Sequence, residues 1–205
     1  MNPILSILIC TVDARYDIRQ RLEKKLLSQM DYSKVEVVVD ADNERSIGSK
    51  RENLKHCANG DYIVYIDDDD HISRNYIRNI LEALETKPDA VGIQGMYTHD
   101  GKNRMKLVCS SHHNSWDFSK ERALLRPINH LNPVRKEIAI RSKFPDISYG
   151  EDRFYSEGLK PFIKTEVMAK GFIYWYDYRP HHSLSILKDI KEEGRGLKML
   201  NRYQM

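Results

Sequence analysis

The chain has 205 residues, which fits one domain, or one domain with a small appendage, and is long enough for a hydrophobic core. Hydrophobic residues make up 40% and charged residues 31%, and the net charge of +3 is too small to indicate nucleic-acid binding by itself. No apolar stretch reaches the roughly 18 residues of a membrane span, and the apolar N-terminal run lacks the basic region and cleavage site of a signal peptide. We therefore expect a soluble, cytoplasmic protein.

Three short apolar runs predict buried strands. They cover residues 4–10, 35–39 and 62–66, and continuous apolar runs are typical of strands covered on both faces. Helical periodicity separates them, with Asp13 and Ser73 as predicted N-caps of the first and third helices. The apolar faces of the three predicted helices are Ile18, Leu22 and Leu26; Ile47, Leu54 and Ala58; and Ile77, Ile80, Leu81 and Leu84. This alternation predicts an α/β fold with a mostly parallel sheet and helices on both faces.

The pattern loosens after residue 97. Residues 98–132 are polar and predict a long functional loop, with a short strand at 105–109. A helix is predicted after Gly150, a last strand at 171–176, and a charged helical tail at 187–205. The three cysteines have no metal-ligand spacing, and the apolar surroundings of Cys10 and Cys57 predict buried, reduced thiols.

Four consecutive aspartates, Asp67 to Asp70, follow the third predicted strand. Adjacent carboxylates repel one another, and partial burial strengthens the repulsion by lowering the dielectric constant. A divalent cation such as Mg²⁺ or Mn²⁺ would make the cluster favourable, because such ions take carboxylate oxygens and substrate phosphates. Since side chains alternate along a strand, Asp67 and Asp69 are expected to share one face. The alternative is a solvated acidic turn that ends the strand.

The other predicted strands end in polar residues as well. Thr11 and Asp13 follow the first strand, and Asp40 and Asp42 follow the second. Ligands of parallel sheets bind beyond the carboxyl ends of the strands, so these residues are expected at one edge. Arg51, on the apolar face of its helix, fits a diphosphate partner, although an arginine reaching out of the core rim is the alternative.

These segments resemble the family-2 glycosyltransferases of the GT-A fold. The resemblance rests on Gly48-Ser-Lys-Arg-Glu-Asn53, on the run Gly60-Asp-Tyr-Ile-Val-Tyr-Ile-Asp-Asp-Asp-Asp70, and on Gly150-Glu-Asp152, and it covers residues 3–185. It implies a Rossmann-like three-layer sandwich over 1–186, with a nucleotide-sugar half (1–97) and an acceptor and catalytic half (98–186).

The resemblance also implies roles for particular residues. Thr11 and Asp40 would contact the nucleotide base and ribose, Arg51 would face the pyrophosphate, and Asp67 with Asp69 would form the D-x-D pair that holds Mn²⁺ or Mg²⁺. The complete nucleotide-sugar set is Thr11, Val12, Asp13, Arg15, Asp40, Asp42, Arg51, Asp67 and Asp68. Asp152 or Glu151 would deprotonate the acceptor hydroxyl, although acidic residues also stabilise helix N-termini without any catalytic role. His181 or His182 would complete the metal site, or would be exposed loop histidines.

The implied activity is metal-dependent, inverting transfer of a sugar from a nucleotide-diphosphate donor, with UDP favoured, to an acceptor hydroxyl. The acceptor stays open between a glycan, a small molecule and a modified nucleic acid, and an oligomer is possible. A nucleotidyltransferase is one alternative, although residues 11–15 lack the glycine-rich loop expected there. A non-catalytic nucleotide- or nucleic-acid-binding module is another, because basic residues cluster between 98 and 143.

Overall fold

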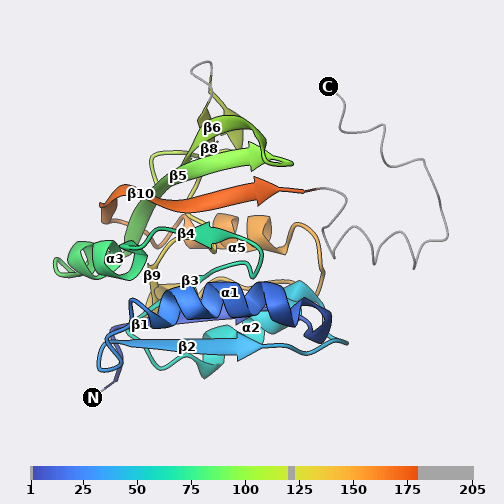
Figure 1. The fold of residues 1–205 in the computed structure, drawn as a ribbon. Coiled ribbons are helices and arrows are strands. Elements are labelled where there is room, and N and C mark those ends of the chain that lie inside the picture. The colour runs from blue at the N-terminus through green and yellow to red at the C-terminus, as the bar shows by residue number, and fades with distance from the viewer. Residues whose placement is uncertain (1, 120–122, 180–205) are drawn as a thin grey trace.

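The structure is a computed structural model that describes residues 2–119 and 123–179, and it is a three-layer α/β sandwich (Figure 1). Within these residues, ten strands form one sheet in the order β2-β1-β3-β9-β5-β6-β8-β7, with β10 beside β5 and β4. The strands are β1 (Leu5–Cys10), β2 (Val35–Asp40), β3 (Tyr62–Tyr65), β4 (His71–Ile72), β5 (Ala90–His99), β6 (Lys102–Cys109), β7 (Asp117–Phe118), β8 (Ala123–Arg126), β9 (Val134–Arg135) and β10 (Glu166–Tyr178). The helices are η1 (Asp13–Arg15), α1 (Tyr16–Leu27), α2 (Ile47–Cys57), α3 (Tyr76–Leu84), α4 (Lys136–Ala139) and α5 (Glu151–Leu159).

The parallel pairings bring the strand ends to one edge. Leu5 of β1 pairs with Val35 of β2 and with Tyr62 of β3, and Cys10 at the end of β1 pairs with Asp40. β10 also runs parallel to β5, whereas antiparallel pairings enter through β6 and the short strands β4, β7 and β9. The predicted α/β fold class is confirmed, and the polar residues after β1, β2 and β3 leave the sheet at the same edge.

The core lies on both faces of the sheet. On one face, Leu22 and Leu26 of α1 and Ile77 and Ile80 of α3 pack with buried residues of β1 such as Ile7. On the other face, the core contains residues of α2, α4 and α5, namely Leu54, Ile138, Tyr155 and Leu159. Helices on both faces explain why β1 and β3 are apolar on both sides.

Two predicted N-caps are wrong. The Asp13 carboxylate accepts a hydrogen bond from Asn43 Nδ2 at 2.7 Å, and α1 begins later, at Tyr16. Ile18, expected on the apolar face of this helix, is 40% exposed. Ser73 precedes the N-cap of α3 by two residues, because its hydroxyl accepts from the Asn75 N–H in a local turn. Such local hydrogen bonds compete with capping.

About half of the described residues in the predicted long loop at 98–132 are in strands. It contains β6, β7 and β8 and the end of β5, and β10 is longer than the strand predicted at 171–176. Only alternate residues near the end of β6, such as Leu107 and Cys109, are buried, and a sheet with one solvated face has a polar sequence. Cys57, predicted to be buried, is exposed.

No helix in the described parts of the chain combines the length and apolar character needed to cross a bilayer. The predicted helical tail, 187–205, lies outside the described residues.

Candidate active site

A cavity of about 540 Å³ opens at the carboxyl edge of the sheet. The turn after β3, the start of α5 and the end of β10 contribute most of its lining. Of the predicted site residues, the lining includes Arg15, Arg51, Asp67, Asp68, Asp69, Glu151 and Asp152. Segments that are about 80 residues apart in sequence therefore meet at one place.

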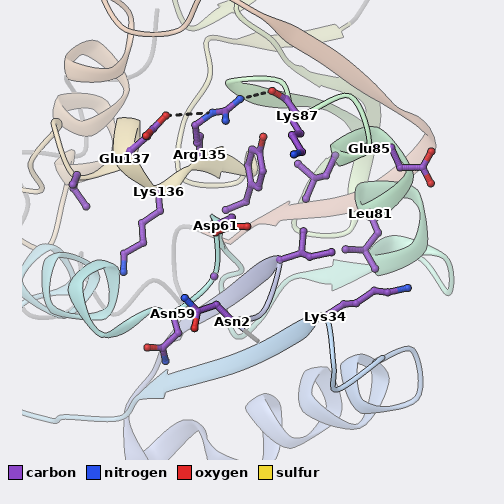
Figure 2. Close-up of a pocket in the computed structure, with 15 residues that line it drawn as sticks. Asn2, Lys34, Asn59, Asp61, Leu81, Glu85, Lys87, Arg135, Lys136 and Glu137 are labelled. Atoms are coloured by element: carbon purple, nitrogen blue, oxygen red, sulfur yellow. Dashed lines mark hydrogen bonds and ion pairs between the residues drawn. The ribbon is translucent and has the colours of Figure 1, made fainter.

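A larger cavity, about 740 Å³, lies at the opposite edge, before the starts of β1 and β3 (Figure 2). In its lining, Arg135 donates to the carbonyl oxygen of Lys87 and lies 3.7 Å from Glu137. Ligands of parallel sheets bind at the carboxyl edge, and the predicted site residues are absent from this lining. We therefore take the smaller cavity as the candidate active site.

The four aspartates divide into two pairs. Asp67 and Asp69 are partly exposed, whereas Asp68 and Asp70 are buried, each with 4% relative exposure. The predicted alternation is present, but β3 ends at Tyr65 and the aspartates form a turn in which Asp70 N–H donates to Asp67 O at 3.1 Å. The turn therefore leaves the Asp67 and Asp69 side chains partly exposed in the cavity. The Asp68 and Asp70 side chains point into the protein, where hydroxyl groups hydrogen-bond them.

The buried aspartates are held by hydroxyl groups. Thr11 Oγ1 donates to Asp68 at 2.6 Å, and the Tyr174 hydroxyl donates to Asp70 at 2.6 Å. Burial raises the pKa of Asp68 to about 6, despite the lowering effects of Arg15 and Thr11. Burial and the neighbouring carboxylates Asp67 and Asp69 raise the pKa of Asp70 well above its usual value.

Arg15 bridges two aspartates at the mouth of the cavity. Its Nη2 lies 3.0 Å from Asp68 Oδ1 and 2.6 Å from Asp69 Oδ2. A guanidinium group here neutralises part of the charge that the turn concentrates. Because Arg15 lines the cavity, its guanidinium group can also contact an anionic group that enters there.

Arg51 joins α2 to both acidic segments. Its Nη2 is 2.6 Å from Asp67 Oδ1, and its Nη1 is 2.7 Å from Glu151 Oε1. Burial by itself would raise the pKa of Asp67, but Arg51 and His130 outweigh burial and hold the pKa well below its usual value. For Glu151, burial prevails over Arg51 and the pKa is raised.

His130, which follows β8, was not predicted as a site residue. Its Nε2 lies 3.5 Å from Asp67 Oδ2 and its Nδ1 lies 3.8 Å from Asp152 Oδ2, and neither nitrogen has a hydrogen-bond partner among the described residues. The side chain has 4% exposure and lines the cavity. Polar residues at 129, 130 and 132 interrupt an otherwise apolar run, which was the available sequence signal.

The two acidic residues of α5 have different surroundings. Gly150 precedes the helix with φ of 81°, a left-handed conformation that favours glycine, and places both residues in the first turn. The Glu151 side chain is 7% exposed and paired with Arg51, whereas that of Asp152 is 23% exposed. Asp152 is therefore the carboxylate of this pair that is more open to a ligand.

The residues after β1 and β2 form a neighbouring group that does not line the cavity. Arg45 Nη2 donates to both carboxylate oxygens of Asp40, at 3.0 and 2.9 Å, and Arg45 Nε lies 3.2 Å from Asp42. Lys50 Nζ donates to the carbonyl oxygens of Thr11 and Asp42, which ties the two strand ends together. Thr11, Val12, Asp13, Asp40 and Asp42 are absent from the cavity lining.

The described residues offer few potential metal ligands that lie close together. Within residues 2–119 and 123–179, no group of three His, Cys, Asp or Glu side chains is arranged to hold a metal ion. The predicted ligands His181 and His182 lie outside the described residues. Two carboxylates, Asp67 and Asp69, face the cavity and fit an ion that takes its remaining ligands from water and a diphosphate.

Together, the three-layer sandwich and the acidic cavity at the carboxyl edge define a GT-A type, Rossmann-like domain. The profile described as "Glycosyl transferase family 2" matches residues 6–146, more than half of the chain. The chain belongs to glycosyltransferase family 2.

Solved structures with the same fold include TarS of S. aureus. TarS 1–349 in complex with UDP-GlcNAc superposes with a TM-score of 0.58 and 12% identity, over 85% of this chain and 58% of that one. TarS 1–349 in complex with UDP gives 0.57 and 12%, over 86% and 61%. This chain thus spans about three fifths of TarS 1–349. Among curated protein sequences, none matches it significantly.

Proposed function

We propose that this chain transfers a sugar from a nucleotide-diphosphate donor, with UDP favoured, to an acceptor hydroxyl, with inversion at the anomeric carbon. One observation carries the proposal: Asp67, Asp69 and Asp152, from segments far apart in sequence, line one cavity at the carboxyl edge. Family membership favours glycosyl transfer over nucleotidyl transfer. The structures of TarS with UDP-GlcNAc and UDP support a uridine nucleotide.

Asp152 is the proposed general base. It accepts the proton of the acceptor hydroxyl while the acceptor oxygen forms a bond to the anomeric carbon and the bond to the diphosphate oxygen breaks, releasing the nucleoside diphosphate. Asp152 lies in the first turn of α5, at the positive end of the helix dipole. Glu151, buried against Arg51, is proposed to position the first turn of α5.

Asp69 and Asp67 would hold Mn²⁺ or Mg²⁺ on the donor side. Such an ion would neutralise charge on the departing diphosphate. Arg15, now on Asp68 and Asp69, is proposed to contact the diphosphate as well. Val12 and Asp13, after β1, with Thr11, Asp40 and Asp42, remain proposed contacts of the base and ribose, in the group next to the cavity.

The two halves of the chain are proposed to have different roles. Residues 1–97 would bind the donor, and 98–186 would bind the acceptor and supply the base. A cytoplasmic location is favoured by three unpaired cysteines.

A thermal-shift panel of UDP-, GDP-, CDP- and TDP-sugars with Mn²⁺ tests the donor. A ligand that binds only the folded state stabilises it by about 2.7 kcal/mol at 100 times its Kd, which is roughly 5–10 °C for a chain of this size. We expect the shift with UDP-sugars. No shift with any of the four would contradict the proposal.

Asp69→Ala tests the donor site more locally. It is expected to abolish the UDP-sugar shift and transfer while the ligand-free melting temperature stays near that of the wild type, because Asp69 is partly exposed. Asp61→Ala is the matched control, since Asp61 is exposed and lines the cavity at the opposite edge. Equal donor binding by Asp69→Ala and wild type would remove Asp69 from this role.

A further inference from the structure

Arg126, the last residue of β8, lies between two aromatic rings in the wall of the cavity. Its guanidinium carbon is 4.4 Å from the centre of the Trp116 ring and 4.5 Å from that of Tyr176. The residue has 9% relative exposure, and all three residues line the same cavity as Asp152. The two rings fix the plane of the guanidinium group.

This buried cation has no carboxylate partner. None of the ion pairs among the described residues involves Arg126, and its Nε has no hydrogen-bond partner there. Arg51, which is similarly buried, has two carboxylates within 2.7 Å. A buried charge without a counter-ion is costly, and aromatic faces offset only part of that cost. Arg126 therefore has the surroundings of a group whose partner is a ligand.

The surroundings of Arg126 also point to the base side of the cavity. Burial lowers the pKa of Arg126, but Tyr176 and Cys109, and among the carboxylates Asp152, raise it above the usual value. Nε1 of Trp116, in the wall of the same cavity, also lacks a hydrogen-bond partner among the described residues, whereas the ring nitrogens of His130 lie 3.5 and 3.8 Å from Asp67 and Asp152. Donor groups of Arg126 and Trp116 are thus available to a ligand in the cavity that Asp152 lines.

We propose that Arg126 binds a carboxylate or phosphate group on a sugar substrate, so that this enzyme acts on an acidic sugar. The inference rests on the proposed function and deepens it. The planar guanidinium group pairs with two oxygens of such an anion in a fixed orientation. The anion belongs either to the transferred sugar of the donor or to the acceptor sugar.

Calorimetric titrations distinguish the two sources. The donor arm compares UDP, UDP-glucose and UDP-glucuronic acid in the presence of Mn²⁺. The acceptor arm, without nucleotide, compares methyl glucoside with methyl glucuronide, and glucose with glucose 6-phosphate. In at least one arm we expect the wild type to prefer the acidic probe by about tenfold or more, as expected of one charge-assisted hydrogen-bonded pair.

The variant Arg126→Met should reduce this preference to about one while the affinity for the neutral probe is unchanged. Arg126→Lys keeps the charge but not the planar stacking, so it should retain part of the preference for the acidic probe. If Arg126→Met does not fold, Arg126→Lys takes its place in the test. Arg141→Met is the matched control, because Arg141 is exposed and its guanidinium stacks on Phe162, at 5.1 Å, away from the cavity.

Three results would overturn the inference: no acidic preference in either arm, a preference that survives in Arg126→Met, or an equal loss of affinity for UDP and both UDP-sugars. The last result would assign Arg126 to the diphosphate. Failure of the wild type to bind UDP would count against the proposed function alone, because the acceptor arm contains no nucleotide and still reports on Arg126.

Discussion

Asp152 and Glu151 are adjacent in sequence but differ in what surrounds them. Glu151 Oε1 is 2.7 Å from Arg51, and burial raises its pKa, so it is occupied within the protein. Asp152 faces the cavity, and His130 is its nearest charged or titratable partner, at 3.8 Å. Environment therefore separates a carboxylate that is paired within the protein from one that is open to the cavity.

Asp152→Asn should lower the transfer rate roughly 10²–10⁴-fold, the usual contribution of a general base. The affinity for UDP should be unchanged, because the donor contacts lie on other residues. The transfer rate is measured as release of UDP in the presence of acceptor, and the affinity for UDP is measured by calorimetry. Glu157→Gln, an exposed change on the same helix, is the control. Near wild-type turnover of Asp152→Asn would remove the base assignment.

The thiols should differ in reactivity. Burial raises the pKa of Cys10 to about 12 and that of Cys109 to about 11, so both remain protonated near neutral pH, whereas Cys57 is exposed. The thiolate is the reactive form. We expect iodoacetamide at pH 8 to label one thiol per folded chain, at Cys57, and three after unfolding in urea. Mass spectrometry of the labelled peptides checks this, and rapid labelling of Cys10 in the folded protein would contradict it.

At the scale of elements, Arg51 links α2, the aspartate turn and the start of α5. It reaches one carboxylate from each of the two acidic segments, and Tyr65 Oη donates to its main-chain carbonyl at 2.7 Å. A hydrogen bond from Gly48 N–H to Ile147 O, 2.9 Å, joins the start of α2 to the segment before α5. These contacts hold the start of α5 close to α2, so that Arg51 and Glu151 are neighbours in space.

Arg51→Met should destabilise the fold by about 3–5 kcal/mol, the cost of removing one partner from a buried ion pair. The double variant Arg51→Met with Glu151→Gln should lose less than the sum of the two single variants, because the second change removes one of the two carboxylates that Arg51→Met leaves without a partner. Urea unfolding of the four proteins measures both quantities. Strict additivity would mean that the two side chains do not stabilise each other.

At the scale of the whole molecule, the sheet brings together groups that carry opposite charges. The cores on both faces of the sheet are built from apolar side chains. The acidic turn at its carboxyl edge is partly neutralised by Arg15 and Arg51. We therefore expect the domain to fold without a bound cation.

EDTA should leave the melting temperature of the ligand-free protein unchanged and remove the shift produced by a UDP-sugar. Adding Mn²⁺ or Mg²⁺ in excess should restore the shift, because an ion held by Asp67 and Asp69, as proposed, would neutralise charge on the diphosphate. Differential scanning fluorimetry with and without the nucleotide separates the two effects. A full UDP-sugar shift in EDTA would show that donor binding needs no metal.

The sequence by itself determined the first three strands with the helices between them, the fold class and the acidic edge. The reason is local: apolar runs, helical periodicity and the charges after residue 66 do not depend on distant contacts. It did not reveal the strands β7 and β8 or the full length of β6 within 98–132, because a sheet with one solvated face has a polar sequence.

Only the tertiary structure decided which charged groups meet. It separated Asp67 and Asp69 from their buried neighbours and placed His130 between Asp67 and Asp152. It also surrounded Arg126 with aromatic rings in place of carboxylates. These contacts join residues up to 63 positions apart, as for Asp67 and His130, and electrostatic interactions depend on distance and burial, which no local pattern encodes.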